Sequence, residues 1–86
     1  VVDLKENESI IRDLCLMKVH TKNVEARTEV MQLAESYGAK IADASLDSMI
    51  LELADEPERI ERFIELMKHF GIKQLFRTGI TAIGRD

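Results

Sequence analysis

The sequence is poor in residues that several protein classes need. It contains no tryptophan, one proline and a single cysteine among 86 residues. One cysteine, Cys15, excludes an internal disulfide framework and fits a reducing compartment, so we expect a cytoplasmic protein. No segment approaches the roughly 18 consecutive apolar residues of a membrane-spanning helix. We therefore expect no membrane partner.

Basic residues are outnumbered by acidic ones, 12 against 16. The formal net charge is −4 and the isoelectric point is about 5.2, and the lysines and arginines are scattered along the chain. A phosphate backbone would be repelled by such a surface. Aromatic residues are few, and of Tyr37, Phe63, Phe70 and Phe76 only the last falls in a predicted strand, which leaves no platform for base stacking. We expect no nucleic-acid partner.

Motifs for catalysis or metal binding are missing as well. Neither of the glycine-rich phosphate-binding patterns, GxGxxG or GxxxxGK[ST], occurs in the sequence. His20, His69 and Cys15 lack the close spacing of metal ligands. Thr78, Ser48 and Cys15 are conceivable nucleophiles, but none has an evident partner base. The sequence therefore predicts no catalytic site, no metal site and no cofactor site.

One sequence pattern occurs twice: a helical pattern ends in an aromatic residue followed by glycine, and an apolar stretch comes next. Tyr37-Gly38 precedes the strand-like residues 40–44, and Phe70-Gly71 precedes the strand-like residues 72–83. Glycine accepts the positive φ that a helix C-terminus often needs. The repetition predicts two similar halves.

Hydrophobic periodicity predicts the remaining elements. Strands are expected at 11–19, 40–44, 48–54 and 72–83, with Gly79 as a bulge or a point of close approach in the last. Helices are expected before Tyr37, capped by Thr21 or Asn23, and after Asp55. The order predicts an α+β, ferredoxin-like (ACT-like) βαββαβ fold, in which two helices cover one face of a four-stranded antiparallel sheet. We expect residues 1–10 to be a connector and 11–86 to be the domain.

The second helix has the clearest start signal in the chain. Asp55 is the expected N-cap, Glu58 its capping-box partner, and Pro57 lies in the first turn. Acidic residues continue along the same helix. We interpret them as a solvated face rather than as an acid–base or Mg²⁺ site; they are Glu56, Glu58, Glu61 and Glu65.

The second face of the predicted sheet is left open and carries apolar residues. Such a face is a natural place for another subunit or domain. The last predicted strand contains the polar segment Arg77-Thr78-Gly79. One interpretation is a bulge in an edge strand, with a charge that discourages the edge from pairing with other chains. The other is a contact point for a partner chain.

Several short segments in order resemble the C-terminal domain of the small, regulatory subunit of acetolactate synthase. Residues 12–19 (RDLCLMKV) resemble the family's Arg-(Glu)-Leu-x-Leu-x-Lys-Val strand, and Arg27 begins its Arg-x-x-(Ile/Val) helix motif. Residues 39–43 (AKIAD) are similar to Ala-Lys-Val-Val-Asp. Phe70-Gly71-Ile72 with Arg77-Thr78-Gly79 resembles the closing Phe-Gly-Ile…Arg-Thr-Gly. The chain departs from the family at Leu53-Ala54-Asp55, where Thr-Gly is common, and at its last two residues.

The resemblance implies a protein without chemistry of its own that binds and activates a catalytic subunit in branched-chain amino acid biosynthesis. Thiamine diphosphate, Mg²⁺ and FAD would belong to that subunit, and this chain would hold no cofactor. The family comparison also implies a homodimer. The residues expected to contact a partner are Arg77, Thr78, Gly79, Ile80 and Ile83.

The family senses valine through an N-terminal ACT domain, and the connector would lead from it. Loops that bind amino acids in ACT domains usually carry glycine after the first strand, whereas residues 20–23 contain none. We therefore expect no valine site in this chain. The alternative hypothesis is a free-standing ACT-like dimer that senses an amino acid between two protomers.

Overall fold

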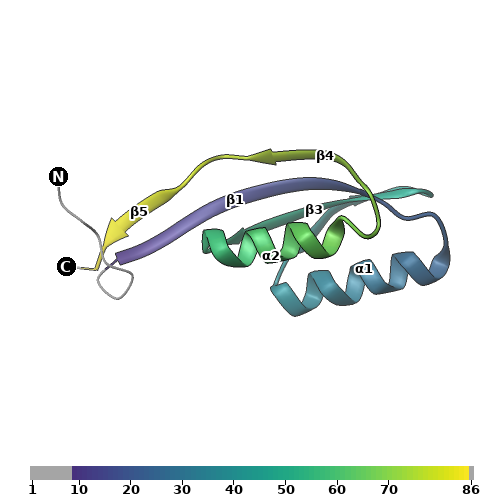
Figure 1. Ribbon diagram of the computed structural model, residues 1–86, viewed down its shortest axis with the longest axis horizontal. Coiled ribbons are helices and arrows are strands. Elements are labelled where there is room, and N and C mark those ends of the chain that lie inside the picture. Colours follow the sequence, from purple (N-terminus) through teal and green to yellow (C-terminus); the bar gives the residue numbers. More distant parts are fainter. Residues whose placement is uncertain (1–8, 86) are drawn as a thin grey trace.

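The computed structural model describes residues 9–85 and contains two helices and five strands. In chain order the elements are β1 (Ser9–His20), α1 (Val24–Tyr37), β2 (Lys40–Ala44), β3 (Ser48–Asp55), α2 (Pro57–Met67), β4 (Ile72–Arg77) and β5 (Thr81–Gly84). Both helices lie on the same side of the sheet (Figure 1). The predicted ferredoxin-like arrangement is confirmed.

β1 is the centre of the sheet. The strand order is β2-β3-β1-β4, every pairing is antiparallel, and β5 pairs with the first residues of β1. β1 is long enough to pair with β4 at residues 15–19 and with β5 at residues 9–12. One strand therefore connects the helix-covered part of the sheet to a two-stranded extension.

Local signals explain where the helices begin and end. The Asn23 side chain accepts a hydrogen bond of 2.8 Å from the backbone N–H of Ala26, which confirms Asn23 as the cap of α1. Gly38 ends α1 with a φ of +74°, a conformation that favours glycine. The N-cap of α2 is Glu56, so the prediction of Asp55 was wrong by one residue. Asp55 stays in β3 and accepts a 2.7 Å hydrogen bond from the Glu56 N–H.

The core lies between the helices and the inner face of β1 and β3. Alternate residues of these strands point inward because side chains alternate across a strand. The Tyr37 and Phe63 rings contact each other across the two helices, with centroids 5.2 Å apart. The buried apolar residues are Cys15, Met17, Val19, Val30, Ala34, Met49, Leu51, Leu53, Ile60, Phe63, Ile64 and Met67.

The two ends of the sheet differ from the prediction. The expected single strand 72–83 is divided into β4 and β5, and Gly79 lies between them with a φ of +97°. β1 begins at Ser9 rather than Ile11 because its first residues pair with β5, so residues 9 and 10 belong to the domain and not to a connector. The rest of the expected connector lies outside the described residues.

We call residues 9–12 of β1 together with residues 80–85, which contain β5, the arm. It extends past the ends of both helices and forms one tip of the molecule, at the left of Figure 1. Two-stranded ribbons are marginally stable by themselves in water. Features that hold the arm to the rest of the sheet are therefore structurally important.

Candidate functional site

The face of the sheet away from the helices carries exposed apolar side chains. Leu16 and Phe76 are direct partners on β1 and β4, and their exposed fractions are 41% and 65%. Ile50, on β3, is half-buried on the same face. We call this surface the open face; its central residues are Leu14, Leu16, Lys18, Ile50, Glu52, Gln74 and Phe76. Its apolar centre is the kind of surface that a protein partner covers.

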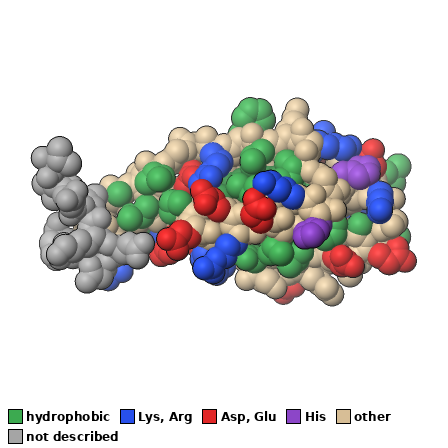
Figure 2. Space-filling model, viewed as in Figure 1, with side chains coloured by type: hydrophobic (Ala, Val, Ile, Leu, Met, Phe, Trp, Pro, Cys, Tyr) green, Lys and Arg blue, Asp and Glu red, His purple; other side chains and the backbone are tan. Residues whose placement is uncertain are grey.

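The arm carries a second set of exposed apolar side chains. Ile10 and Ile83 are direct cross-strand partners and are 42% and 69% exposed, and Ile80, just before β5, is 66% exposed. In Figure 2 hydrophobic side chains are visible over the arm, whereas charged side chains gather over α2. Three exposed isoleucines at the tip of a thin ribbon indicate a surface that is covered in an assembly.

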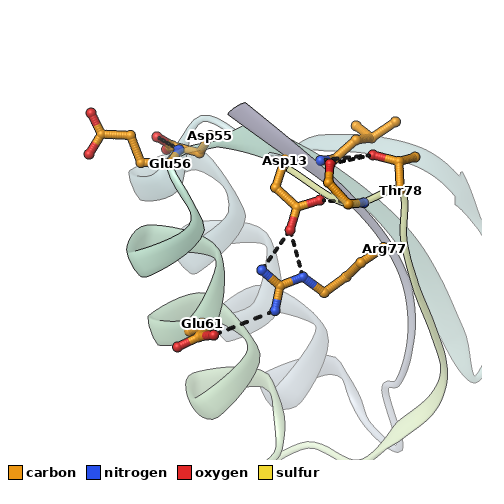
Figure 3. A network of polar contacts seen from close by, with 8 residues as sticks. Asp13, Asp55, Glu56, Glu61, Arg77 and Thr78 are labelled. Atoms are coloured by element: carbon orange, nitrogen blue, oxygen red, sulfur yellow. Dashed lines mark hydrogen bonds and ion pairs between the residues drawn. The ribbon is translucent and has the colours of Figure 1, made fainter. Parts of the chain in front are cut away.

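A network of polar contacts joins the arm to the sheet (Figure 3). The carboxylate of Asp13 on β1 is 2% exposed and accepts hydrogen bonds through both oxygens. Its Oδ2 lies 2.6 Å from Nη2 and 2.8 Å from Nε of Arg77. Its Oδ1 accepts a 3.1 Å hydrogen bond from the Gly79 N–H. A buried carboxylate needs such partners, because an unpaired charge there would be strongly destabilising.

Neighbouring residues complete the same connection. The Thr78 N–H donates to the Leu14 carbonyl at 3.0 Å, and the Thr78 hydroxyl accepts from the Leu14 N–H at 3.3 Å. Glu61 on α2 lies 3.7 Å from Nη1 of Arg77. Hydrogen bonding to Asp13 raises the pKa of Arg77, so this cation stays charged. The segment that joins β4 to β5 is thus tied to β1 at Thr78 and at Gly79.

The five predicted contact residues separate into two groups. Arg77, Thr78 and Gly79 bond to β1 of their own chain, whereas Ile80 and Ile83 are exposed on the arm. The prediction that these residues contact a partner stays a prediction. Asp13 was not predicted as a functional residue. The signal was the alternation along the strand, which places its carboxylate on the same inward face as Cys15 and Met17.

The remaining candidate nucleophiles and metal ligands do not gather into one site among the described residues. Burial raises the pKa of the Cys15 thiol, and the nearby Arg77 guanidinium only partly opposes that effect. This disfavours Cys15 as a nucleophile, because the thiolate is the reactive form. The hydroxyl of Ser48, the first residue of β3, lies 2.9 Å from the hydroxyl of Ser45 in the preceding turn. Among residues 9–85, no three His, Cys, Asp or Glu side chains are grouped as metal ligands would be.

Neither helix between residues 9 and 85 has the length and apolar character required to cross a membrane.

Comparison with known proteins gives a consistent result. The sequence model of the family described as "Small subunit of acetolactate synthase" matches residues 12–86. The chain is 39% identical over 85 residues to a probable acetolactate synthase small subunit of Methanothermobacter thermautotrophicus, covering 99% of this chain and 51% of that protein. It is 38% identical over 86 residues to the acetolactate synthase small subunit of Aquifex aeolicus, covering all of this chain and 45% of that protein.

A solved structure shares the fold. The crystal structure of an acetolactate synthase small subunit from Thermotoga maritima superposes with a TM-score of 0.88 at 31% identity, over 98% of this chain and 51% of that one. This chain spans about half the length of these relatives. The sequence match, the identity and the shared fold agree, and the chain belongs to the family of acetolactate synthase small subunits.

Proposed function

We propose that this chain is a non-catalytic module of an acetolactate synthase small subunit, which binds the catalytic subunit and raises its activity in branched-chain amino acid biosynthesis. The observation that carries the proposal is the family match over residues 12–86. The described residues add two exposed apolar surfaces, the open face and the arm, which suit a protein that works by association.

The arm is the surface we assign to the catalytic subunit. Ile80 and Ile83 are more than 60% exposed, and Arg12 and Arg85 of the arm line one pocket together with Glu56 and Glu58 at the start of α2. An apolar groove flanked by charges of both signs would complement this tip. Arg77, Thr78 and Gly79 would act indirectly, because their contacts with Asp13 and Leu14 set the direction of the arm.

The division of chemistry follows from the same proposal. Thiamine diphosphate, Mg²⁺ and FAD would be held by the catalytic subunit and not by this chain. The role of this chain would be to stabilise the active conformation of its partner. A partner that binds one conformation more tightly shifts the population toward it, and its effect is limited by that difference in affinity.

An activity assay tests the proposal. Acetolactate formation by the purified catalytic subunit is measured with increasing concentrations of the 86-residue chain, and the chain is also assayed alone. We expect saturable stimulation and no activity of the chain by itself. Ile83→Glu should require a higher concentration for the same effect, whereas Leu46→Glu, a change at a fully exposed turn residue on another edge, should behave as wild type. Absence of stimulation together with absence of binding would contradict the proposal.

A further inference from the structure

The central strand β1 extends beyond the end of its neighbour β3. Pairing between the two runs from His20 to Asp13, where Asp55 is the last partner, and the chain then leaves the sheet to form α2. β1 continues to Ser9 and pairs there with β5 on its other side. Among the described strands, none pairs with residues 10–12 on the side of β3. The sheet therefore has a vacant strand position in line with β3.

The backbone of Ile11 faces this vacant position. The N–H and C=O groups of successive strand residues point to opposite sides of the strand. The N–H and C=O of Leu14 bond to Thr78 on the β4 side, so those of Ile11, three residues earlier, point to the side of β3. The Ile11 carbonyl accepts a 2.7 Å hydrogen bond from Nη1 of Arg12. A side chain thus supplies the donor that a neighbouring strand would otherwise supply.

A cavity of about 340 Å³ borders the vacant position. Four successive residues of β1, 9–12, line it, and because successive side chains point to opposite faces, the cavity reaches the edge of the strand. Residues 56–58 line it from the start of α2. Ligand pockets commonly measure roughly 300–1,000 Å³, so this cavity has room for an apolar side chain. Its apolar lining consists of Ile10, Ile11, Pro57 and Ile80.

Charges of both signs surround the cavity. Arg12 and Arg85 belong to the arm, and Glu56 and Glu58 lie at the start of α2. All four side chains are exposed, and none belongs to an ion pair within the part of the chain that the structure describes. They are therefore available to charged groups of a partner on either side of the cavity.

We propose that an extended segment of the catalytic subunit adds to the sheet as a strand beside residues 10–12 of β1 and places an apolar side chain in the cavity. In this mode of recognition, main-chain hydrogen bonds give affinity and side-chain pockets give specificity. The segment would bond to the N–H and C=O of Ile11, and Arg12 would release that carbonyl and pair with an acidic residue. A small molecule in the cavity would leave the edge of the strand unpaired, whereas an extended segment satisfies both.

The inference rests on the proposed function and deepens it. The arm is the surface assigned to the catalytic subunit, and the groove that receives the arm would supply the added strand as one of its walls. The vacant position lies where β1 enters the arm, so the two contacts are continuous.

Proline at position 11 tests the proposal. Ile11→Pro removes the N–H that faces the vacant position and keeps the hydrogen bonds between β1 and β5, which are made by other residues. Ala82→Pro is the matched control, because Ala82 is the direct partner of Ile11 and its N–H points to the outer edge of the arm. The dissociation constant of the complex with the catalytic subunit, measured by calorimetric titration, should be at least about tenfold higher for Ile11→Pro than for Ala82→Pro. Urea denaturation checks that both variants are folded.

Amide hydrogen exchange gives a second measurement that needs no substitution. In the free 86-residue chain the Ile11 N–H should exchange faster than those of Ile10 and Arg12, which face β5. With the catalytic subunit at saturating concentration, exchange at Ile11 should slow by at least about tenfold. Exchange at Ala82 should slow less, because no strand is added at that edge.

Two results would overturn this inference alone. The catalytic subunit would bind Ile11→Pro as tightly as Ala82→Pro, or exchange of the Ile11 N–H would be the same in the complex as in the free chain. Failure of the wild-type chain to bind the catalytic subunit would overturn the proposed function, and this inference with it.

Discussion

Asp13 and Arg77 lie 64 residues apart in the sequence and form the closest ion pair at the junction between β4 and the arm, with 2.6 Å between Oδ2 and Nη2. The Asp13 side chain is 2% exposed and that of Arg77 is 30% exposed. The same carboxylate accepts the Gly79 N–H, so a single side chain on β1 connects the end of β4 to the start of the arm.

Replacing Asp13 should therefore destabilise the fold. Asp13→Asn keeps the size of the side chain but removes the charge that faces Arg77, and we expect the free energy of unfolding to fall by about 2–3 kcal/mol, measured by urea denaturation. Asp47→Asn is the control, because the Asp47–Lys73 pair spans 3.8 Å and is exposed. It should change stability by less than about 0.5 kcal/mol. Equal losses in the two variants would contradict the role assigned to Asp13.

Gly79 should tolerate no side chain without strain. Its φ of +97° lies in the region that other residues rarely adopt, although a Cβ would meet no atom within 4 Å. We expect Gly79→Ala to lower the free energy of unfolding by about 1–2 kcal/mol through backbone strain alone. Gly84→Ala, in β5 and outside the positive-φ set, should be close to neutral. A neutral Gly79→Ala would show that the junction adopts another conformation in solution.

Phe76 should matter for association more than for folding. Its side chain is 65% exposed, so Phe76→Ala should change monomer stability by less than about 1 kcal/mol. If the open face is a dimer interface, the same change should weaken dimerisation by about 1–2 kcal/mol, as truncation of an aromatic interface residue commonly does. Leu46→Ala is a matched control, since Leu46 is 99% exposed and lies in the turn between β2 and β3. Sedimentation at several concentrations measures both variants.

Asp55 should make stability depend on pH in the acid range. Burial raises the pKa of Asp55, but the hydrogen bonds from Arg59 and from the Glu56 N–H outweigh it and lower the pKa overall. A lowered folded-state pKa contributes stability that is full above the unfolded value of about 3.9 and is lost as pH falls through the folded value. Asp55→Asn should thus be less stable than wild type by about 0.5–1 kcal/mol at pH 7. The difference should shrink below about pH 4; a constant difference in thermal unfolding down to pH 2 would contradict this.

Much of the fold could be predicted because its signals are local. Asn23 caps α1, Gly38 and Gly71 have positive φ at the predicted helix-to-strand junctions, and alternation identified the strands. The predicted N-cap of α2 failed by one residue because Asp55 keeps its place in β3 opposite Asp13. Its carboxylate instead accepts from Arg59 at 2.7 Å. The pairing of β3 with β1 keeps Asp55 in the strand and leaves Glu56 as the N-cap, and the local sequence pattern alone does not distinguish these two acidic residues.

The arm and its junction were less predictable because they depend on distant contacts. The start of β1 at Ser9 follows from pairing with Gly84, near the other end of the chain, and nothing near Ser9 indicates it. Arg77-Thr78-Gly79 was recognised as unusual, but its partner Asp13 was not, since an ion pair between strands depends on their register. The open face was expected to be apolar, whereas the positions of Lys18 and Glu52 on it become visible only with that register.

Association with an acetolactate synthase catalytic subunit would appear as added mass when the two proteins are mixed. Light scattering after gel filtration gives the mass of the catalytic subunit with and without the 86-residue chain. We expect a complex heavier than the catalytic subunit alone, with a gain in mass that falls for Ile80→Glu and Ile83→Glu but not for Leu46→Glu. An unchanged catalytic-subunit mass at saturating concentrations of the folded chain would contradict it.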